Sequence, residues 1–512
     1  MINRRWFIGS AAAGILLPAS LARAAVKTNP FTLGVASGSP RSDSVILWTR
    51  LAVDPLQGGA MPAGDVVVGF RVWEDAERRK LLREGTVIAP EADAHSVHLK
   101  LEGLRPGREY WYAFTLGDFE SPLGRTRTTS PDAENVRLAL ASCQSWQSGF
   151  YAAYTDIAAW APDCVIHVGD YIYEGGIGTI GSRTVAKTGE TLSFRTVRLH
   201  NSAEIVTLWD YRNRYALYKS DRALQAAHAA APWIVAMDDH EVDNNWAGDV
   251  PQDPRAQTAL EFSVRKLAAF KAWYEHMPVE RPPLIDDISA SLAMNDVFRF
   301  GSAQVHLLDT RQYRSDQVCG EGFPGQAPCK QYGNANRTLL GAVQEQWLKR
   351  ELRASSARYN VLASQIWLSP WRFDAGGDAP EVNMDAWDGY PAARERLTET
   401  LADGIANPVI MSGDWHCAAA MTLHQRPFDP SSRPVAHEFA GTSISSDCGW
   451  MREMEDSKTS NPHAHYLNAR KRGYCRFEVG TKQWVTTYRV VADPYVADSP
   501  LSNDVEMRLA DL

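Results

Sequence analysis

The sequence is poor in cysteine, has no long apolar run beyond its first residues and carries no excess of basic side chains. Its 512 residues include only seven cysteines at scattered positions, which excludes a disulfide-rich scaffold and a zinc ribbon. No later stretch reaches the 18 uninterrupted apolar residues that a membrane-spanning helix needs. The net charge is -8, from 53 Lys and Arg against 61 Asp and Glu, so we expect no nucleic-acid-binding surface.

The overall composition is that of a globular protein. Hydrophobic residues make up 45% and charged residues 22% of the chain, and the length predicts two or three domains. Composition therefore limits the class of protein without indicating an activity.

The first 24 residues have the pattern of an export signal. Arg4 and Arg5 precede a short apolar stretch, and the segment ends in the small-residue pattern Ala22-Arg23-Ala24. We interpret residues 1–24 as a twin-arginine signal peptide, with a retained amphipathic anchor as the alternative. Its removal takes away three arginines and no acid, which leaves 488 residues with a net charge of -11. We therefore expect the mature form to be periplasmic or secreted, without a stable membrane span, after contact with the twin-arginine export machinery.

Residues 25–130 read as a small all-β sandwich. Alternating or apolar runs predict strands at Ser44 to Arg50, Val66 to Trp73, Ser96 to Leu101 and Tyr110 to Thr115. The turn at 104–107 and the tyrosines that follow resemble the tyrosine corner of fibronectin type III domains. The polar run at 125–133 is interpreted as a linker.

Residues 131–491 have the alternating strand and helix pattern of an α/β domain. Helices are expected at 149–160, 211–230 and 254–276, and two closing strands at 473–491, followed by a tail at 492–512. Five short apolar runs end in polar clusters, at 137–141, 164–168, 233–237, 305–308 and 408–411. Polar groups at the carboxyl ends of buried strands converge on one rim of a sheet, so we expect one shared active site.

These strand ends offer an unusual mixture of metal ligands. They are Cys143, Asp170, Tyr173, Asp239, His240, Asp414 and His416. Carboxylates suit hard cations, whereas thiolate, phenolate and imidazole favour a transition metal, so the set predicts a mixed two-metal site of the kind that hydrolyses phosphoesters.

Each candidate also has a simpler interpretation. Cys143 could be a buried apolar thiol, Asp239 and Asp414 could be helix N-caps, and His240 could be a structural histidine. The recurrence of ligands at corresponding strand ends favours the metal site. His167 lies inside an apolar run and is expected in the core, while His463 and His465 are expected at the surface.

The motifs resemble those of the calcineurin-like metallophosphatases. Gly169-Asp170-Tyr171-Ile172-Tyr173 matches their G-D-x-x-Y motif, 238–241 (DDHE) stands in place of G-N-H-[DE], and 413–416 (GDWH) in place of G-H-x-H. The departures, including Cys143 in place of the first Asp, match the PhoD-like alkaline phosphatase family. So do the segments 31–39 (FTLGVASGS) and 45–50 (VILWTR).

This resemblance implies a fold, a cofactor set and a reaction. The implied fold is an α/β (α+β) metallophosphatase sandwich of two mixed sheets flanked by helices, preceded by a small fibronectin type III-like sandwich. A ferric ion, Fe(III), would be bound by Cys143, Asp170, Tyr173 and His416, and calcium, Ca(II), by Asp170, Asp239 and Asp414. A metal-bound hydroxide would attack phosphorus, and the tail at 492–512 would lie near the active site.

The remaining site residues receive roles in catalysis and substrate binding. His240 would donate a proton or a hydrogen bond to the leaving oxygen. Asn244 and Arg311 follow strand ends and are candidate phosphate contacts.

The expected activity is hydrolysis of phosphate esters outside the cytoplasm, as a phosphomonoesterase or phosphodiesterase. A phospholipase D-like phosphodiesterase on the same site is the alternative enzyme. A non-catalytic surface-binding protein would lack ligands that are present here, and a purple acid phosphatase would use more histidine.

The other cysteines are assigned separately. Cys319 and Cys329 bracket a Gly- and Pro-rich loop and are expected to form a disulfide after export, with Cys448 and Cys475 as a weaker pairing. Cys164 is expected to be buried, and Cys417 should point away from His416 on an extended segment.

Overall fold

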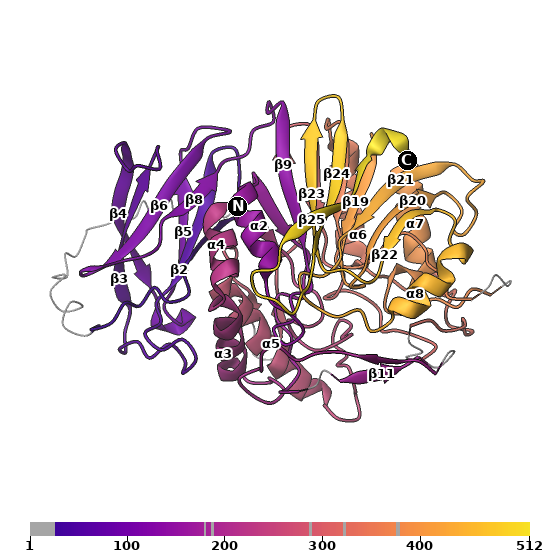
Figure 1. Ribbon diagram of the computed structural model, residues 1–512, viewed down its shortest axis with the longest axis horizontal. Helices are drawn as coiled ribbons and strands as arrows, with labels where there is room; N and C mark the ends of the chain where they lie inside the picture. The colour runs from indigo at the N-terminus through magenta and orange to yellow at the C-terminus, as the bar shows by residue number, and fades with distance from the viewer. Residues whose placement is uncertain (1–25, 179–180, 186–188, 286–288, 321–323, 375–378) are drawn as a thin grey trace, which may run out of the picture.

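Two large mixed β-sheets pack face to face, and a smaller β-sandwich extends from one end of them (Figure 1). The computed structural model describes residues 26–178, 181–185, 189–285, 289–320, 324–374 and 379–512. The predicted signal peptide at 1–24 lies outside the described residues.

The first large sheet has nine strands in the order β25-β24-β23-β9-β10-β13-β1-β2-β5. Strands β9, β10, β13 and β1 run parallel, and the outer strands are antiparallel. The bounds are β1 Val35–Gly38, β2 Ser44–Arg50, β5 Ser96–Glu102, β9 Asn135–Ala141, β10 Cys164–His167, β13 Pro232–Val235, β23 Gly473–Gly480, β24 Trp484–Val491 and β25 Leu501–Arg508.

The second large sheet has seven strands in the order β16-β17-β18-β19-β21-β20-β22, with β17, β18, β19 and β21 parallel. The bounds are β16 Asp296–Phe300, β17 Ala303–Leu307, β18 Tyr359–Ala363, β19 Pro408–Ser412, β20 Ala418–His424, β21 Pro434–Ala440 and β22 Ala464–Asn468. Buried apolar side chains from both sheets, such as Leu138, Val409 and Phe439, belong to one core cluster. The main core therefore lies between the sheets.

Helices cover the outer faces of the two sheets. Buried residues of α6 and α7 pack with Leu362 and Ile410 of the second sheet, and α2, α3, α4 and α5 pack around the first. The helices are α2 Ala152–Trp160, α3 Leu208–Lys219, α4 Arg222–Ala230, α5 Ala259–His276, α6 Gly341–Ala354, α7 Pro391–Ala402 and α8 Met451–Ser457. Short 3₁₀ helices are η1 Glu91–Asp93, η2 Trp387–Gly389, η3 Lys458–Ser460 and η4 Leu509–Asp511.

The N-terminal sandwich consists of a five-stranded sheet packed against strands of the nine-stranded sheet. Its own core holds residues such as Val45, Leu47, Val68 and Phe114. The strands of the five-stranded sheet are β3 Val66–Trp73, β4 Leu81–Ala89, β6 Glu109–Leu116, β7 Phe119–Glu120 and β8 Gly124–Arg127. Two small hairpins complete the structure, β11 Ser182–Thr184 with β12 Thr191–Ser193, and β14 Leu284–Ile285 with β15 Ala290–Ser291.

The expected fold class is confirmed, with differences in detail. The run at 125–133 begins inside strand β8, which pairs with β6, so its first residues are part of the sandwich. The predicted helix at 211–230 is two helices, because the Asp221 side chain accepts hydrogen bonds from the backbone N–H groups of Ala223 and Leu224 and starts α4 anew.

Two expectations about single residues are wrong. His463 is buried, because its Nε2 lies 2.7 Å from the carbonyl oxygen of Pro370 in a distant loop that packs on it. Cys448 and Cys475 are both free and buried, while Cys319 and Cys329 form a disulfide. Within the described parts of the chain, no helix is long and apolar enough to cross a membrane.

Candidate metal centre

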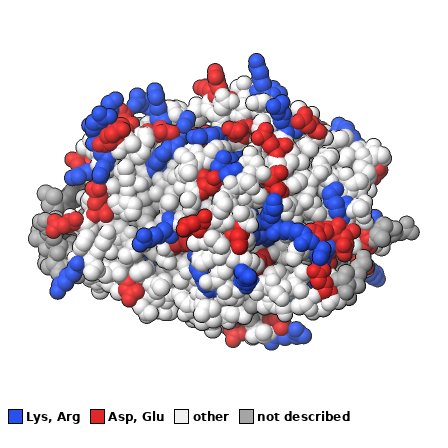
Figure 2. Space-filling view, in the orientation of Figure 1, with Lys and Arg blue, Asp and Glu red and all other residues white. Residues whose placement is uncertain are grey.

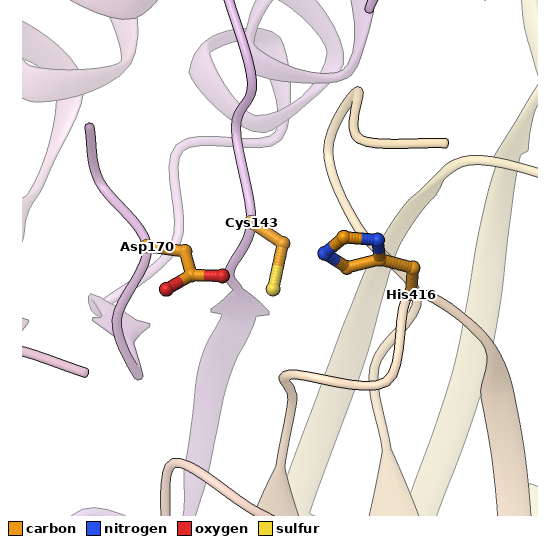
Figure 3. Close-up of side chains that lie close together, drawn as sticks. All are labelled: Cys143, Asp170 and His416. Carbon is orange, nitrogen blue, oxygen red and sulfur yellow. The ribbon is translucent and has the colours of Figure 1, made fainter. Parts of the chain in front are cut away.

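The ligand candidates lie in loops that follow parallel strands of both sheets. Cys143 follows β9, Asp170 follows β10, and Asp239 and His240 follow β13, which are neighbours in the first sheet. Asp414 and His416 follow β19 in the second sheet. Figure 3 shows the side chains of Cys143, Asp170 and His416 pointing toward one another from the two sides.

Four of these residues have a backbone conformation that non-glycine residues rarely adopt. Their φ angles are 57° at Cys143, 56° at Asp170, 66° at Asp414 and 50° at His416. Each residue in this conformation lowers the free energy of unfolding by about 1–3 kcal/mol, and the conformation persists only where the surrounding structure imposes it. The shared conformation marks a sharp backbone turn directly after each of these strands.

Two glycines allow the loops to approach closely. A Cβ on Gly169, whose φ is +114°, would lie 2.3 Å from the Cβ of Asp238 in the neighbouring loop. A Cβ on Gly413 would lie 2.5 Å from Oγ of Ser142, across the gap between the two sheets. These glycines therefore set how closely the ligand loops can pack.

The first ligand group combines sulfur, oxygen and nitrogen atoms. Ligand atoms of Cys143, Asp170 and His416 all lie within 4.8 Å of one another. The Tyr173 hydroxyl donates to Oδ2 of Asp170 at 2.9 Å and lies 3.1 Å from Nε2 of His416, so it joins the same group. Ser446 donates a hydrogen bond to this hydroxyl at 2.8 Å.

His416 is held in the tautomer that a metal ligand requires. Its Nδ1 lies 2.7 Å from the carbonyl oxygen of Asp447, so Nδ1 carries the proton and Nε2 is left to bind. Burial lowers the pKa of His416 to about 3, which keeps the imidazole neutral.

Two further ligand groups are rich in carboxylates and share Asp170 with the first. One contains Asp170, Asp239 and His240, and the other contains Asp170, Asp238, Asp239 and Asp414. Because Asp170 belongs to all three groups, its two oxygens can bridge two ions.

The carboxylates of this site lack enough protein cations to balance them. Burial raises the pKa of Asp170 and of Asp414 well above the usual range of a carboxyl group, and neighbouring acids raise it further. Oδ1 of Asp170 and Oδ1 of Asp239 are buried and have no hydrogen bond to any of the residues that the structure describes. Buried carboxylate oxygens without partners are costly unless a cation binds them, so the donor set fits metal ions.

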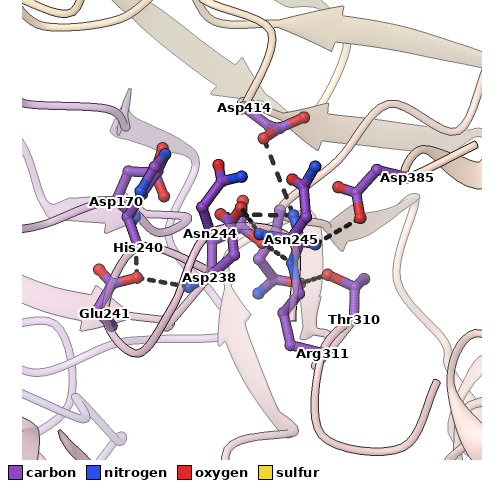
Figure 4. A network of polar contacts seen from close by, with 12 residues as sticks. Asp170, Asp238, His240, Glu241, Asn244, Asn245, Thr310, Arg311, Asp385 and Asp414 are labelled. Carbon is purple, nitrogen blue, oxygen red and sulfur yellow. Dashed lines mark hydrogen bonds and ion pairs between the residues drawn. The ribbon is translucent and has the colours of Figure 1, made fainter. Parts of the chain in front are cut away.

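Arg311 provides part of the positive charge (Figure 4). Its Nε lies 2.5 Å from Oδ1 of Asp238 and its Nη1 lies 2.9 Å from Oδ1 of Asp385. Its Nη2 has no hydrogen bond within the described part of the chain and faces Asp239 at 3.5 Å and Asp414 at 4.0 Å. Burial would raise the pKa of Asp239, but Arg311 and His240 together lower it below its usual range.

His240 is oriented by a buried acid. Its Nδ1 lies 2.6 Å from Oε2 of Glu174, whose Oε1 accepts the backbone N–H of Asn244 at 2.9 Å. Burial lowers the pKa of His240, but Glu174, Asp170 and Asp239 outweigh burial and raise it well above its usual value. With Nδ1 occupied by Glu174, Nε2 is the nitrogen left for a ligand.

Glu241 joins two of the ligand loops. Its Oε2 accepts the backbone N–H groups of Asp170 at 3.1 Å and Asp238 at 2.8 Å, and its Oε1 accepts that of Tyr171 at 2.5 Å. One fully buried carboxylate thus fixes the relative positions of the loops after β10 and β13.

A cavity of about 240 Å³ opens onto the ligands. Asp170, Asp239, Asp414, His240 and His416 line it on the metal side. Asn244, one of the two predicted phosphate contacts, also lines the cavity. Arg311, the other predicted phosphate contact, is only 1% exposed, and its guanidinium group faces the carboxylate of Asp239. Its position is therefore that of a charge partner to the acids.

The sequence motifs contained some site residues that we did not assign. Asp238 and Glu241 flank the predicted pair in 238–241, and Glu174 directly follows Tyr173. Asp385 and Asp447 carry no local signal, because they reach the site from loops far along the chain.

Comparisons with known proteins identify the family of this chain. The sequence matches the model of the PhoD-like phosphatase family at residues 138–488 and that of the PhoD-like phosphatase N-terminal domain at 17–130. Alkaline phosphatase D from Bacillus subtilis (strain 168) is 45% identical over 477 residues, which cover 92% of this chain and 78% of that protein.

Two solved structures share the fold. The structure titled "Structure of PhoD" matches with a TM-score of 0.87 and 42% identity, covering 94% of this chain and 91% of that chain. A purple acid phosphatase from yellow lupin (Lupinus luteus) matches with a TM-score of 0.53 and 12% identity over 93% of this chain and 74% of its own, a likeness of fold alone. Two family models that together span most of the chain, and a relative at 45% identity, lead to one conclusion: the chain belongs to the PhoD-like phosphatase family.

Proposed function

We propose that this protein is an exported alkaline phosphatase D-like enzyme that hydrolyses phosphate monoesters or diesters with a ferric ion and calcium. Phosphoester hydrolysis follows from its family, and the cofactors, site roles and location are our proposal. The observation that carries it is the convergence of three overlapping ligand groups on one cavity lined by His240 and Asn244.

The ligand chemistry supports one transition-metal site with mixed donor atoms and one site with oxygen donors alone. Cys143, Tyr173 and His416 offer sulfur, phenolate and imidazole, which suit Fe(III), together with a bridging oxygen of Asp170. Asp239 and Asp414, with the other oxygen of Asp170, suit Ca(II), and Asp238 is an additional oxygen donor nearby. Bound there, the two metals would activate a water molecule and neutralise phosphoryl oxygens.

The chain's own residues would orient the substrate and protonate the leaving group. Glu174 holds Nδ1 of His240, so Nε2 of His240 would donate to the leaving oxygen. Asn244, whose backbone Glu174 also fixes, would contact a phosphoryl oxygen from the cavity wall. Arg311 would act indirectly, by holding Asp238 and balancing Asp239 and Asp414.

Metal analysis together with activity on small esters tests this proposal. Purified protein supplied with iron and calcium should cleave p-nitrophenyl phosphate or bis-p-nitrophenyl phosphate, and Cys143→Ala should lose the iron and the activity. The faster of the two substrates distinguishes a monoesterase from the phospholipase D-like alternative. Negligible turnover of both by metal-loaded protein would contradict the proposal.

Export through the twin-arginine route is proposed from the leader at residues 1–24. Replacing Arg4 and Arg5 by lysine should retain the activity inside the cytoplasm in cell fractionation. Unchanged export of the double variant would contradict the assignment.

The C-terminal segment is proposed to lie near the site, as its contacts suggest. The Tyr495 hydroxyl donates to Oδ1 of Asp447 at 3.2 Å, and the Asp447 carbonyl accepts from His416. Residues 501–508 form strand β25 at the edge of the first sheet, so only the loop before this strand is placed to influence the ligand.

A further inference from the structure

The cavity beside the metal ligands has an apolar part that the reaction at phosphorus does not require. Phe373, Trp415 and Trp450, which we call the aromatic wall, line it together with Met384 and Pro324. A phosphate oxygen could accept a hydrogen bond from an indole N–H group, but the faces of these rings and the side chains of Met384 and Pro324 offer only apolar contact.

The rings of the wall are held in fixed orientations. Trp415 is buried and stacks on Trp367 with centroids 4.6 Å apart and an interplanar angle of 15°. Phe373 lies 5.8 Å from Trp415 at 18°, and Trp450 stacks on His416 at 5.2 Å and 25°. Phe373 and Trp450 are partly exposed, so they present ring surface to the cavity.

A cross-linked loop supports this part of the cavity. The disulfide between Cys319 and Cys329 closes a loop that contributes Gly320 and Pro324 to the cavity lining. Gly325 of the same loop packs so closely that a Cβ there would lie 2.6 Å from the Phe373 ring. Gly325 and the Phe373 ring therefore fix each other's position.

A second hollow on the other side of the site has a different character. It has a volume of about 390 Å³ and shares His240, His416 and Trp450 with the first cavity. Its further lining includes the polar residues Ser145, Gln147 and Ser148 and the aromatic residues Tyr173 and Phe194. Phe373 and Trp415 line the first cavity and do not line this one.

We propose that the aromatic wall binds the planar organic group of the phosphoester, an aryl ring or a nucleobase, by stacking. This inference rests on the proposed phosphoester hydrolysis and adds its substrate class. Stacking of one ring on an aromatic side chain changes affinity by about 5-fold to 100-fold on alanine substitution, because each ring face replaces water by contact area.

Phosphonates test binding apart from chemistry, because their C–P bond is not hydrolysed and no leaving group enters. With the metal-loaded enzyme, phenylphosphonate should inhibit more tightly than ethylphosphonate. Phe373→Ala should weaken phenylphosphonate about 10-fold and leave ethylphosphonate unchanged. Phe373→Tyr should retain the preference, and Phe373→Leu, which keeps apolar volume without a ring, should lose most of it.

The controls separate stacking from damage to the site. Trp209 is an aromatic residue that is 53% exposed and does not line the cavity, so Trp209→Ala should change neither affinity. Trp450→Ala is compared only after metal analysis, because its ring stacks on His416.

Equal affinity of the wild-type enzyme for the two phosphonates would overturn the inference, as would equal weakening of both by Phe373→Leu. Either result in an enzyme that still hydrolyses p-nitrophenyl phosphate would leave the proposed function standing. An enzyme without any phosphoester hydrolysis would instead contradict the proposed function.

Discussion

Replacing Gly169 by alanine should damage the metal centre although no ligand residue is replaced. Gly169 precedes Asp170 and has a φ of +114°, and a Cβ there would lie 2.3 Å from Cβ, 2.8 Å from the backbone nitrogen and 3.1 Å from Cα of Asp238. None of these atoms belongs to the flexible end of a side chain. The loop after β10 or the loop after β13 must therefore move.

The expected cost has two parts. A non-glycine residue at positive φ costs roughly 1–2 kcal/mol, and forcing an extra carbon into packed backbone costs about 1–3 kcal/mol more. The free energy of unfolding should thus fall by about 2–5 kcal/mol. Because the moved loops carry Asp170, Asp238 and Asp239, metal affinity should fall about 10-fold to 100-fold, as when supporting residues of a metal site are lost.

Gly404 provides a matched control for the backbone part. Its φ is +76°, and a Cβ there would meet nothing within 4 Å. Gly404→Ala should therefore show only the cost of the conformation, with unchanged metal content. Urea unfolding of the metal-free proteins and metal titration of each variant make the comparison. Equal stability of the two variants with equal metal affinity would refute the close packing of the two ligand loops.

Four further predictions concern the ligands, the acid and a buried base. Tyr173→Phe should weaken and shift the visible charge-transfer absorption of iron-loaded protein, to which the Cys143 thiolate would still contribute, and an unchanged band would contradict phenolate ligation. His240→Asn should lower kcat by about 10²-fold to 10⁴-fold at unchanged metal content, which steady-state kinetics with metal analysis can check. Removal of metals by a chelator should lower the melting temperature, since the buried acids lose their cations; an unchanged melting temperature would argue against bound metal. Burial lowers the pKa of Lys219 to about 7. Between pH 7 and about 10 the unfolded chain therefore binds this proton and the folded protein does not, so the free energy of unfolding rises with pH in that range. Lys219→Met should flatten this rise in urea unfolding, and an unaltered slope would contradict the lowered pKa.

Much of the fold was predictable because apolar runs and turn residues carry local information. The strands predicted at 44–50 and 66–73 appear with the same bounds, since both have continuous or alternating apolar residues. Strand β4, Leu81–Ala89, was missed because eight of its nine residues are not buried and show no apolar face. Strand β25 was missed for the same reason, as an edge strand in which none of the eight residues is buried.

The ligands of the candidate site could be predicted from local sequence, whereas the residues that orient them could not. Motif residues such as Asp170, Asp239 and His416 could be named, because each follows an apolar run within a few residues. The hydrogen bonds that orient them come from elsewhere in the chain, as with the Asp447 carbonyl that fixes His416. The role of Arg311 also needed coordinates, because only burial and its distances to Asp238 and Asp385 distinguish a charge partner from a substrate contact.

Strands of the N-terminal sandwich support the metal site, and no local sequence pattern indicates this. Strand β1 pairs in parallel with β13, the strand that leads to Asp239 and His240, and Gly38 lies so close that a Cβ there would be 2.7 Å from the Trp233 carbonyl oxygen. The indole N–H of Trp48 also donates to the Glu275 carbonyl at 3.1 Å. Without these strands, β13 would become an exposed edge with unpaired backbone groups next to the metal ligands. The N-terminal strands therefore support the sheet that carries the metal ligands. The sequence shows the sandwich as a separate domain because the pairing of strands from distant segments leaves no pattern in either segment alone.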